Sequence, residues 1–160
     1  MDIQIFKGIL SQNQETLIRG YCTQKVYGKT AAIILKGSQN RWLGIVIKGA
    51  AAMDLTPEHK LRFEVGETFG EIAFLDDGKR TAKVYACEED TEIAFLSWDK
   101  LQEISKKNAK IHALIMVNLA IMLAKRLRAS DIVIAEQISK AATEKNTGLI
   151  NKLTTALRGK

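Results

Sequence analysis

Residues of the types that bind a phosphate group gather in one segment, 69–82, which reads Phe-Gly-Glu-Ile-Ala-Phe-Leu-Asp-Asp-Gly-Lys-Arg-Thr-Ala. Gly70 has no Cβ and therefore lets a ligand approach the backbone closely, while the amides of a short helical turn at 71–73 can point at an anion. Arg80 follows an Asp77-Gly78 turn and offers a permanently charged fork of donors that suits one phosphate. These groups predict a phosphate cradle.

Glu71 adds a second requirement to the ligand. An ionised carboxylate only accepts hydrogen bonds and is repelled by phosphate, so its useful partner is a neutral donor such as a ribose 2′-hydroxyl. The single charge of Arg80 matches a phosphate diester with one negative charge, and the ligand that fits is a cyclic nucleotide. The predicted ligand-binding residues are Phe69, Gly70, Glu71, Ile72, Ala73, Arg80, Thr81 and Ala82.

At these residues the chain resembles the phosphate-binding cassette of the cyclic nucleotide-binding domain family, which includes regulatory modules of protein kinases A and G, nucleotide-gated channels and the catabolite activator protein. The spacing matches the kinase and channel members without a gap. Leu35-Lys36-Gly37 and the run 42–49 look like the earlier glycine-punctuated hairpin of the family, and 65–67 like its pre-cassette turn. Lys79 departs from the family, because kinase members tend to have proline there.

The resemblance spans about 6–127 and implies a non-catalytic regulatory domain for cyclic AMP or cyclic GMP, as a stand-alone domain of signal transduction. An alternative treats Gly70 and Gly78 as ordinary turn glycines, with Glu71 and Arg80 as a surface ion pair. A further alternative is a domain that kept the shape and changed its ligand. The cassette residues fall in register with two earlier glycine landmarks, which favours nucleotide binding.

Size and composition predict one cytoplasmic domain. The chain has 160 residues and is 46% hydrophobic, which is ample for a core. Its start, Met1-Asp2-Ile3-Gln4, has an early acid and no apolar run typical of a signal peptide. The apolar stretch 113–124 is well short of the roughly 18 residues that a membrane helix requires, so we expect a buried helix.

Neither enzymatic chemistry nor a metal site is indicated. Cys22 and Cys87 lie far apart with no ligand spacing, and His59 and His112 have no nucleophile in an evident relation to them. The net charge of +6 would admit nucleic acid, but the basic residues are scattered and the clusters at 106–110 and 125–128 are typical of solvated helix faces.

The pattern along the chain predicts an α+β fold built on a β-roll, similar to a jelly roll or double-stranded β-helix. We expect one domain over 1–160, with a helical flank at 1–21, the roll at 22–98 and helices at 99–160. Ser11 to Gln14 reads as a capping box for the first helix. The expected strands are Ala32 to Leu35, Gly44 to Ile47, Leu61 to Val65, Ala82 to Ala86 and Glu92 to Leu96.

After Ser97 the spacing of apolar residues becomes helical. Leu101 and Ile104 mark a short helix, and a long one follows with a first stripe, Ile111, Ile115, Leu119 and Met122, and a second, Leu114, Ile121 and Leu127. Two apolar stripes need two covers, so we expect a homodimer through the long helix. The alternative is that the segment beyond Gln137 folds back, with its short amphipathic helix at 149–157 behind Gly148.

The resemblance also implies a mechanism, in which the long helix is a lid that repositions when the nucleotide binds. Comparison with the catabolite activator protein makes Ser130 and Asp131 possible contacts of the base. Thr81 stands where cyclic GMP-dependent members carry threonine, so it admits cyclic GMP without excluding cyclic AMP. Of the two we favour cyclic AMP, the commoner messenger if the chain is bacterial.

Three functional classes follow from these features. The first is a small sensor read by an unidentified protein effector. The second is a transcriptional regulator of the catabolite activator type without its own reader, because the roughly twenty residues after the long helix cannot supply a helix-turn-helix module. The third is a degenerate structural or adaptor domain that no longer binds nucleotide.

Overall fold

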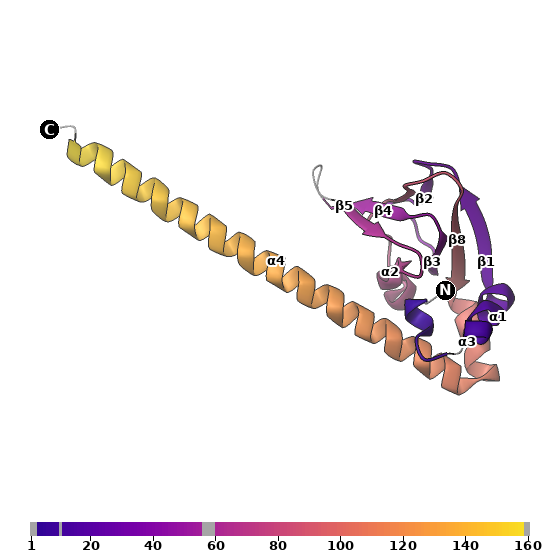
Figure 1. Cartoon of the computed structure of the whole chain (residues 1–160). Coiled ribbons are helices and arrows are strands. Elements are labelled where there is room, and N and C mark those ends of the chain that lie inside the picture. The colour runs from indigo at the N-terminus through magenta and orange to yellow at the C-terminus, as the bar shows by residue number, and fades with distance from the viewer. Residues whose placement is uncertain (1–2, 10, 56–59, 159–160) are drawn as a thin grey trace. The chain divides into compact units, whose positions relative to one another are not determined.

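The structure is a computed structural model that describes the backbone of residues 3–9, 11–55 and 60–158, and their side chains apart from those of 11, 12, 136–138 and 140–158. The chain divides into one unit that ends at Leu119 and another that begins at Ala120. Figure 1 shows the elements. In chain order they are η1 (Gln4–Phe6), α1 (Ser11–Tyr21), β1 (Cys22–Tyr27), β2 (Ala32–Ile34), β3 (Trp42–Lys48), β4 (Ala51–Asp54), β5 (Lys60–Phe63), β6 (Thr68–Phe69), α2 (Glu71–Asp76), β7 (Val84–Ala86), β8 (Thr91–Ser97), α3 (Trp98–Lys107) and α4 (Ala109–Arg158).

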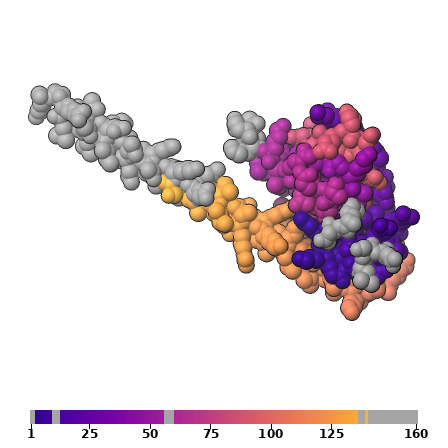
Figure 2. Space-filling view, in the orientation of Figure 1, coloured from indigo at the N-terminus to yellow at the C-terminus, as the bar shows by residue number. Residues whose placement is uncertain are grey.

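The first unit contains two antiparallel four-stranded sheets, with strand orders β1-β8-β3-β6 and β2-β7-β4-β5. Buried side chains from both sheets form one core: Ile34, Val46, Ala51, Phe63, Phe69, Val84, Ile93 and Phe95. On the face shown in Figure 2, the side chains of the roll form a continuous surface. The predicted α+β fold with a β-roll is confirmed.

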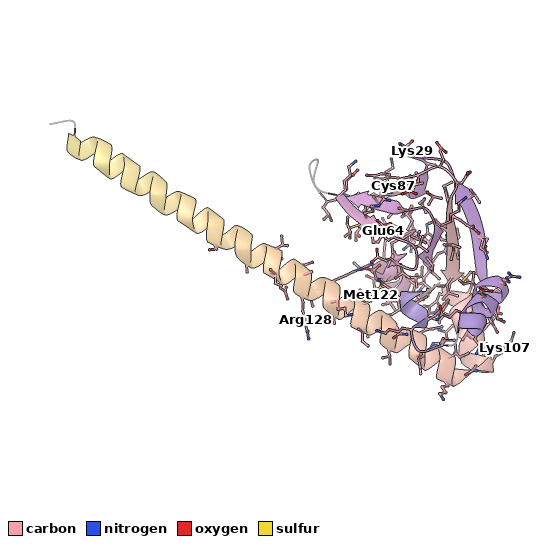
Figure 3. All side chains as sticks on the ribbon, viewed as in Figure 1. Lys29, Glu64, Cys87, Lys107, Met122 and Arg128 are labelled. Atoms are coloured by element: carbon pink, nitrogen blue, oxygen red, sulfur yellow. The ribbon has the colours of Figure 1, made fainter. Side chains whose placement is uncertain are left out.

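Helices α1 and α3 contact the strands at the end of the roll where β1 begins and β8 ends. In Figure 3 Lys107, in the last turn of α3, marks this end, and Lys29, in the turn after β1, marks the opposite end. Ser97 caps α3, since its hydroxyl accepts from the Lys100 amide at 3.2 Å.

All five predicted strands are present, with boundaries shifted by at most two residues. Three further strands, β1, β4 and β6, were not predicted. Four of the six side chains of β1 are exposed, β4 begins with two alanines, and β6 has only two residues. None of them carries the alternating apolar pattern on which the prediction relied.

The predicted capping box stays a prediction, because the Ser11 side chain lies outside the described residues. Ser11 is the first residue of α1, and the amide group of Gln14 makes contacts with the segment before the helix. Its Oε1 accepts from the Ile3 amide at 3.3 Å, and its Nε2 donates to the Ile9 carbonyl at 2.8 Å. Gln14 is buried, and these hydrogen bonds connect α1 to the segment that precedes it.

Helix α4 runs from Ala109 to Arg158 without a break, so Gly148 does not separate a short helix at 149–157 from the long one, and that part of the prediction is wrong. The stretch 113–124 is buried on one side only: Ile115 and Leu119 are buried, whereas Val117 and Ile121 are exposed. The polar residue within this stretch, Asn118, binds the N-terminal segment: its Nδ2 donates to the carbonyls of Ile5 and Lys7 at 3.0 and 2.9 Å. Among the described residues, no helix combines the length and apolar character needed to cross a bilayer.

The start of the cassette is set by one close approach between two strands. Gly44 of β3 pairs with Phe69 of β6, and the Phe69 ring lies where a Cβ on residue 44 would be. The ring also packs on Phe63, with centroids 5.4 Å apart. Gly44 therefore lets Phe69 enter the core and fixes the backbone from which Gly70 continues.

We expect Gly44→Ala to lower the free energy of unfolding by about 1–3 kcal/mol, because the added methyl group overpacks the core against the Phe69 ring. Gly20→Ala is the control, since a Cβ there meets open space on α1, and it should raise stability by about 0.5–1 kcal/mol. Urea denaturation followed by circular dichroism measures both. Unchanged stability of Gly44→Ala would contradict this placement of Phe69.

Candidate functional site

The cassette begins with a left-handed residue and a short helix. Gly70 has φ 80° and ψ 17° and is the N-cap of α2, and its carbonyl accepts from the Phe74 amide at 3.2 Å. The amides of 71–73 are the first of this helix, and the first amides of a helix have no partner within it. The predicted turn after the helix is also present, since Asp77 is left-handed and the Gly78 amide donates to the Asp76 carboxylate at 2.8 Å.

Arg80 returns to Gly70 across the nine intervening residues of the cassette. Its Nη1 donates to the Gly70 carbonyl at 2.6 Å. Its Nε and Nη2 both donate to Oδ1 of Asn40, at 2.9 and 2.6 Å, and Nη2 also donates to the Trp42 carbonyl. The sequence prediction that Gly70 and Arg80 lie together is thus matched by the geometry.

The guanidinium group is buried among neutral acceptors. Arg80 is 4% exposed and Glu71 is 6% exposed, so these two residues are not a surface ion pair, and that alternative is wrong. Burial lowers the pKa of Arg80, and the nearby charge of Glu71 opposes this shift. The four described hydrogen bonds of this cation go to the side-chain oxygen of Asn40 and to two backbone carbonyls, all of which are neutral. A buried cation with neutral partners favours the binding of an anion to its guanidinium group.

Two glycines make this position of Arg80 possible. A Cβ on Gly70 would clash with Nη1 of Arg80 and would lie 3.3 Å from Cδ1 of Ile34. Gly37, also left-handed, donates its amide to the Arg80 carbonyl at 2.8 Å, and the Arg80 amide donates to Ser38 at 2.9 Å. The glycine landmark before β3 therefore holds the backbone of Arg80, which explains why the two motifs occur together.

Asn40 and the Trp42 carbonyl are functional groups that the sequence prediction missed. Asn40 lies between the first glycine landmark and β3, and Trp42 is the first residue of β3. Asn40 looks like any polar loop residue, and a backbone carbonyl carries no side-chain signal. Only the return of Arg80 to this loop reveals their role, which is to orient the guanidinium.

The other predicted residues differ in exposure. Phe69 and Ala73 are buried and support the cassette from within. Ile72 is half-exposed, Thr81 is exposed, and Ala82 is partly buried. The role of Thr81 toward a base stays a prediction.

Ser130 and Asp131, the predicted base contacts, belong to the second unit and are exposed on α4. The Ser130 hydroxyl donates to the Arg126 carbonyl at 3.1 Å, a bond within the helix. Their role toward a base stays a prediction. In the described part of the chain, no group of three or more His, Cys, Asp or Glu side chains could hold a metal ion.

A family model described as cyclic nucleotide-binding domain matches residues 24–108. This range contains the whole cassette and both sheets, except for the first two residues of β1. The chain belongs to the cyclic nucleotide-binding domain family. Within this family, the match covers the loop with Asn40 as well as Gly70 and Arg80.

Relatives and solved structures agree with this assignment. The cyclic AMP receptor protein of Thermus thermophilus is 30% identical over 133 residues, which are 80% of this chain and 59% of that protein. The crystal structure of Thermus thermophilus catabolite activator protein matches with a TM-score of 0.69 at 26% identity. The match covers 82% of this chain and 61% of the Thermus chain. A cyclic nucleotide-binding domain from Methylobacillus flagellatus has a TM-score of 0.67 at 20% identity, covering 79% and 76%. The chain therefore spans about three fifths of the length of the two Thermus proteins.

We expect Asn40→Ala to lower the free energy of unfolding by about 1–3 kcal/mol, because it removes the described acceptor of Arg80 Nε and one of the two acceptors of Nη2. Asn40→Asp keeps an oxygen in the same place and should restore most of the loss. Chemical denaturation compares the two variants with the wild type. Equal losses in both would show that Asn40 acts through packing and not by accepting from Arg80.

Proposed function

We propose that the chain is a small non-catalytic sensor that binds a cyclic nucleotide at the cassette of Gly70 to Ala82. The observation that carries this proposal is the buried guanidinium of Arg80 at the N-terminus of α2, bonded to neutral acceptors. An incoming phosphate diester replaces one of these acceptors and neutralises the charge. The amides of the first turn of α2, which have no partner within the helix, supply further donors.

Glu71 distinguishes a nucleotide from a simple anion. Its carboxylate lies next to the anion site and is nearly buried, so a free phosphate or sulfate gains nothing from it. A ribose hydroxyl in that position donates to it instead. The name of the Thermus relative, cyclic AMP receptor protein, supports cyclic AMP as the preferred ligand, and the accessible hydroxyl of Thr81 leaves cyclic GMP as the alternative.

Arg80→Ala should weaken binding of cyclic AMP by about 2–5 kcal/mol, because the phosphate charge would then be buried without a partner. Isothermal titration calorimetry measures this loss for both nucleotides. Arg62→Ala is the matched control, since Arg62 is an exposed arginine of β5. It pairs with Glu64, which follows β5, and with Glu88, which follows β7. Arg62→Ala should bind as the wild type does, and wild-type affinity in Arg80→Ala would place the binding site elsewhere.

We also propose a homodimer formed by α4, with the helix as the element that moves on binding. Five apolar residues at spacings of three, four and seven, Val117, Ala120, Ala124, Leu127 and Ile134, are exposed and share one face of the helix. This seam includes Leu127 of the second predicted stripe, and Leu114 and Ile121 of that stripe lie beside it, three residues before and four residues after Val117. Asp131 falls in the same seam, where it could meet a base held between two copies.

Light scattering should give a mass of two chains at micromolar concentration. Changing Leu127 and Ile134 together to lysine places like charges in the seam and should give the mass of one chain. Ile132→Lys, which changes an equally exposed residue away from the seam, should leave the mass unchanged. A wild-type mass of one chain would contradict the dimer.

A transcriptional regulator of the catabolite activator type is the second candidate, and the similarity to the Thermus protein of that name favours it. The described part of α4 is a single helix to Arg158 and contains no helix-turn-helix, so a reader would have to come from elsewhere. Retardation of duplex DNA that weakens steeply with salt would favour this candidate.

For the sensor we expect a cytoplasmic protein effector, with the segment 149–157 as its contact.

A further inference from the structure

Arg41 lies where the cassette helix, the start of β3 and the start of α3 meet. Its Nε donates to the Phe74 carbonyl at 2.9 Å and its Nη2 to the Leu75 carbonyl at 3.2 Å. Its guanidinium carbon lies 3.7 Å from the ring centroid of Trp98, the first residue of α3. One side chain thus contacts two helices that the chain separates by more than twenty residues.

The end of α2 depends on this contact. The last carbonyls of a helix have no partner within it, and α2 has only six residues. Arg41 takes two of these carbonyls and places a positive charge at the C-terminal end of the helix, where the backbone dipoles favour a cation. Nη1 also lies 3.9 Å from the carboxylate of Asp77, the C-cap.

Trp98 is held to the same point by three contacts. The guanidinium of Arg41 stacks on the indole ring, a favourable contact between a cation and an aromatic face. The Trp98 amide donates to the Arg41 carbonyl at 3.0 Å. The Phe74 ring of α2 meets the indole edge-on, with centroids 5.4 Å apart and planes at 70°.

We propose that Arg41 is a positioning residue that joins the cassette helix to α3, so that nucleotide binding at the cassette changes the surroundings of Trp98. This inference rests on the proposed function. Asn40, the neighbour of Arg41 in the chain, holds Arg80 by two hydrogen bonds. A phosphate that draws Arg80 away from Asn40 releases the loop that carries Arg41, and Arg41 contacts both α2 and Trp98.

Fluorescence of Trp98 tests the transmission. The chain has two tryptophans, so Trp42→Phe leaves Trp98 as the only one. In this background cyclic AMP should shift or quench the emission, and Arg41→Gln should remove at least three quarters of that change while affinity by calorimetry falls less than tenfold. Arg62→Gln, the matched exposed arginine, should keep the full response. A full response in Arg41→Gln, or binding without any response in the parent, overturns the inference.

Hydrogen exchange of the ligand-free protein tests the joint by itself. Arg41→Gln should speed amide exchange at least fivefold in both 74–78 and the first turn of α3, and Arg62→Gln in neither. Unchanged exchange in either segment overturns the inference. If the parent binds neither cyclic AMP nor cyclic GMP, the proposed function fails, and this ligand-free measurement alone decides whether Arg41 joins the two helices.

Discussion

The burial of one guanidinium group among neutral acceptors is the constraint on which the site depends. Arg80 is charged at any physiological pH, yet its described hydrogen bonds go to the Asn40 side chain and to two backbone carbonyls. A buried cation is costly unless its donors are satisfied and an anion is within reach. Asn40 and the carbonyls of Gly70 and Trp42 satisfy the donors, and the proposed phosphate supplies the anion.

Several features of the roll serve this arrangement. Gly44 admits the Phe69 ring into the core, which fixes the point where the cassette starts. Gly70 leaves room for the guanidinium, and Gly37 holds the backbone of Arg80. The loop 40–42 then supplies Asn40 and the Trp42 carbonyl to Arg80, and Arg41 to the far end of α2. Strands far apart in sequence are therefore needed to hold one short segment.

The sequence predicted the cassette because its residues are local: a glycine, an acid and an arginine at fixed spacing carry their own signal. It also predicted the β-roll and the helices that follow. It missed Asn40 and Arg41, because their importance comes from which elements meet in space and not from their neighbours in the chain. It also placed a break at Gly148, where one weak helix former does not outweigh the continuity of α4.

The crystal structure of the complex with cyclic AMP tests the central claim most directly. The account predicts the phosphate within hydrogen-bond distance of the Arg80 guanidinium and of the first amides of α2, with the ribose 2′-hydroxyl donating to Glu71. A nucleotide bound at another place, with Arg80 still held by Asn40 and Gly70 and no anion beside it, would contradict the account.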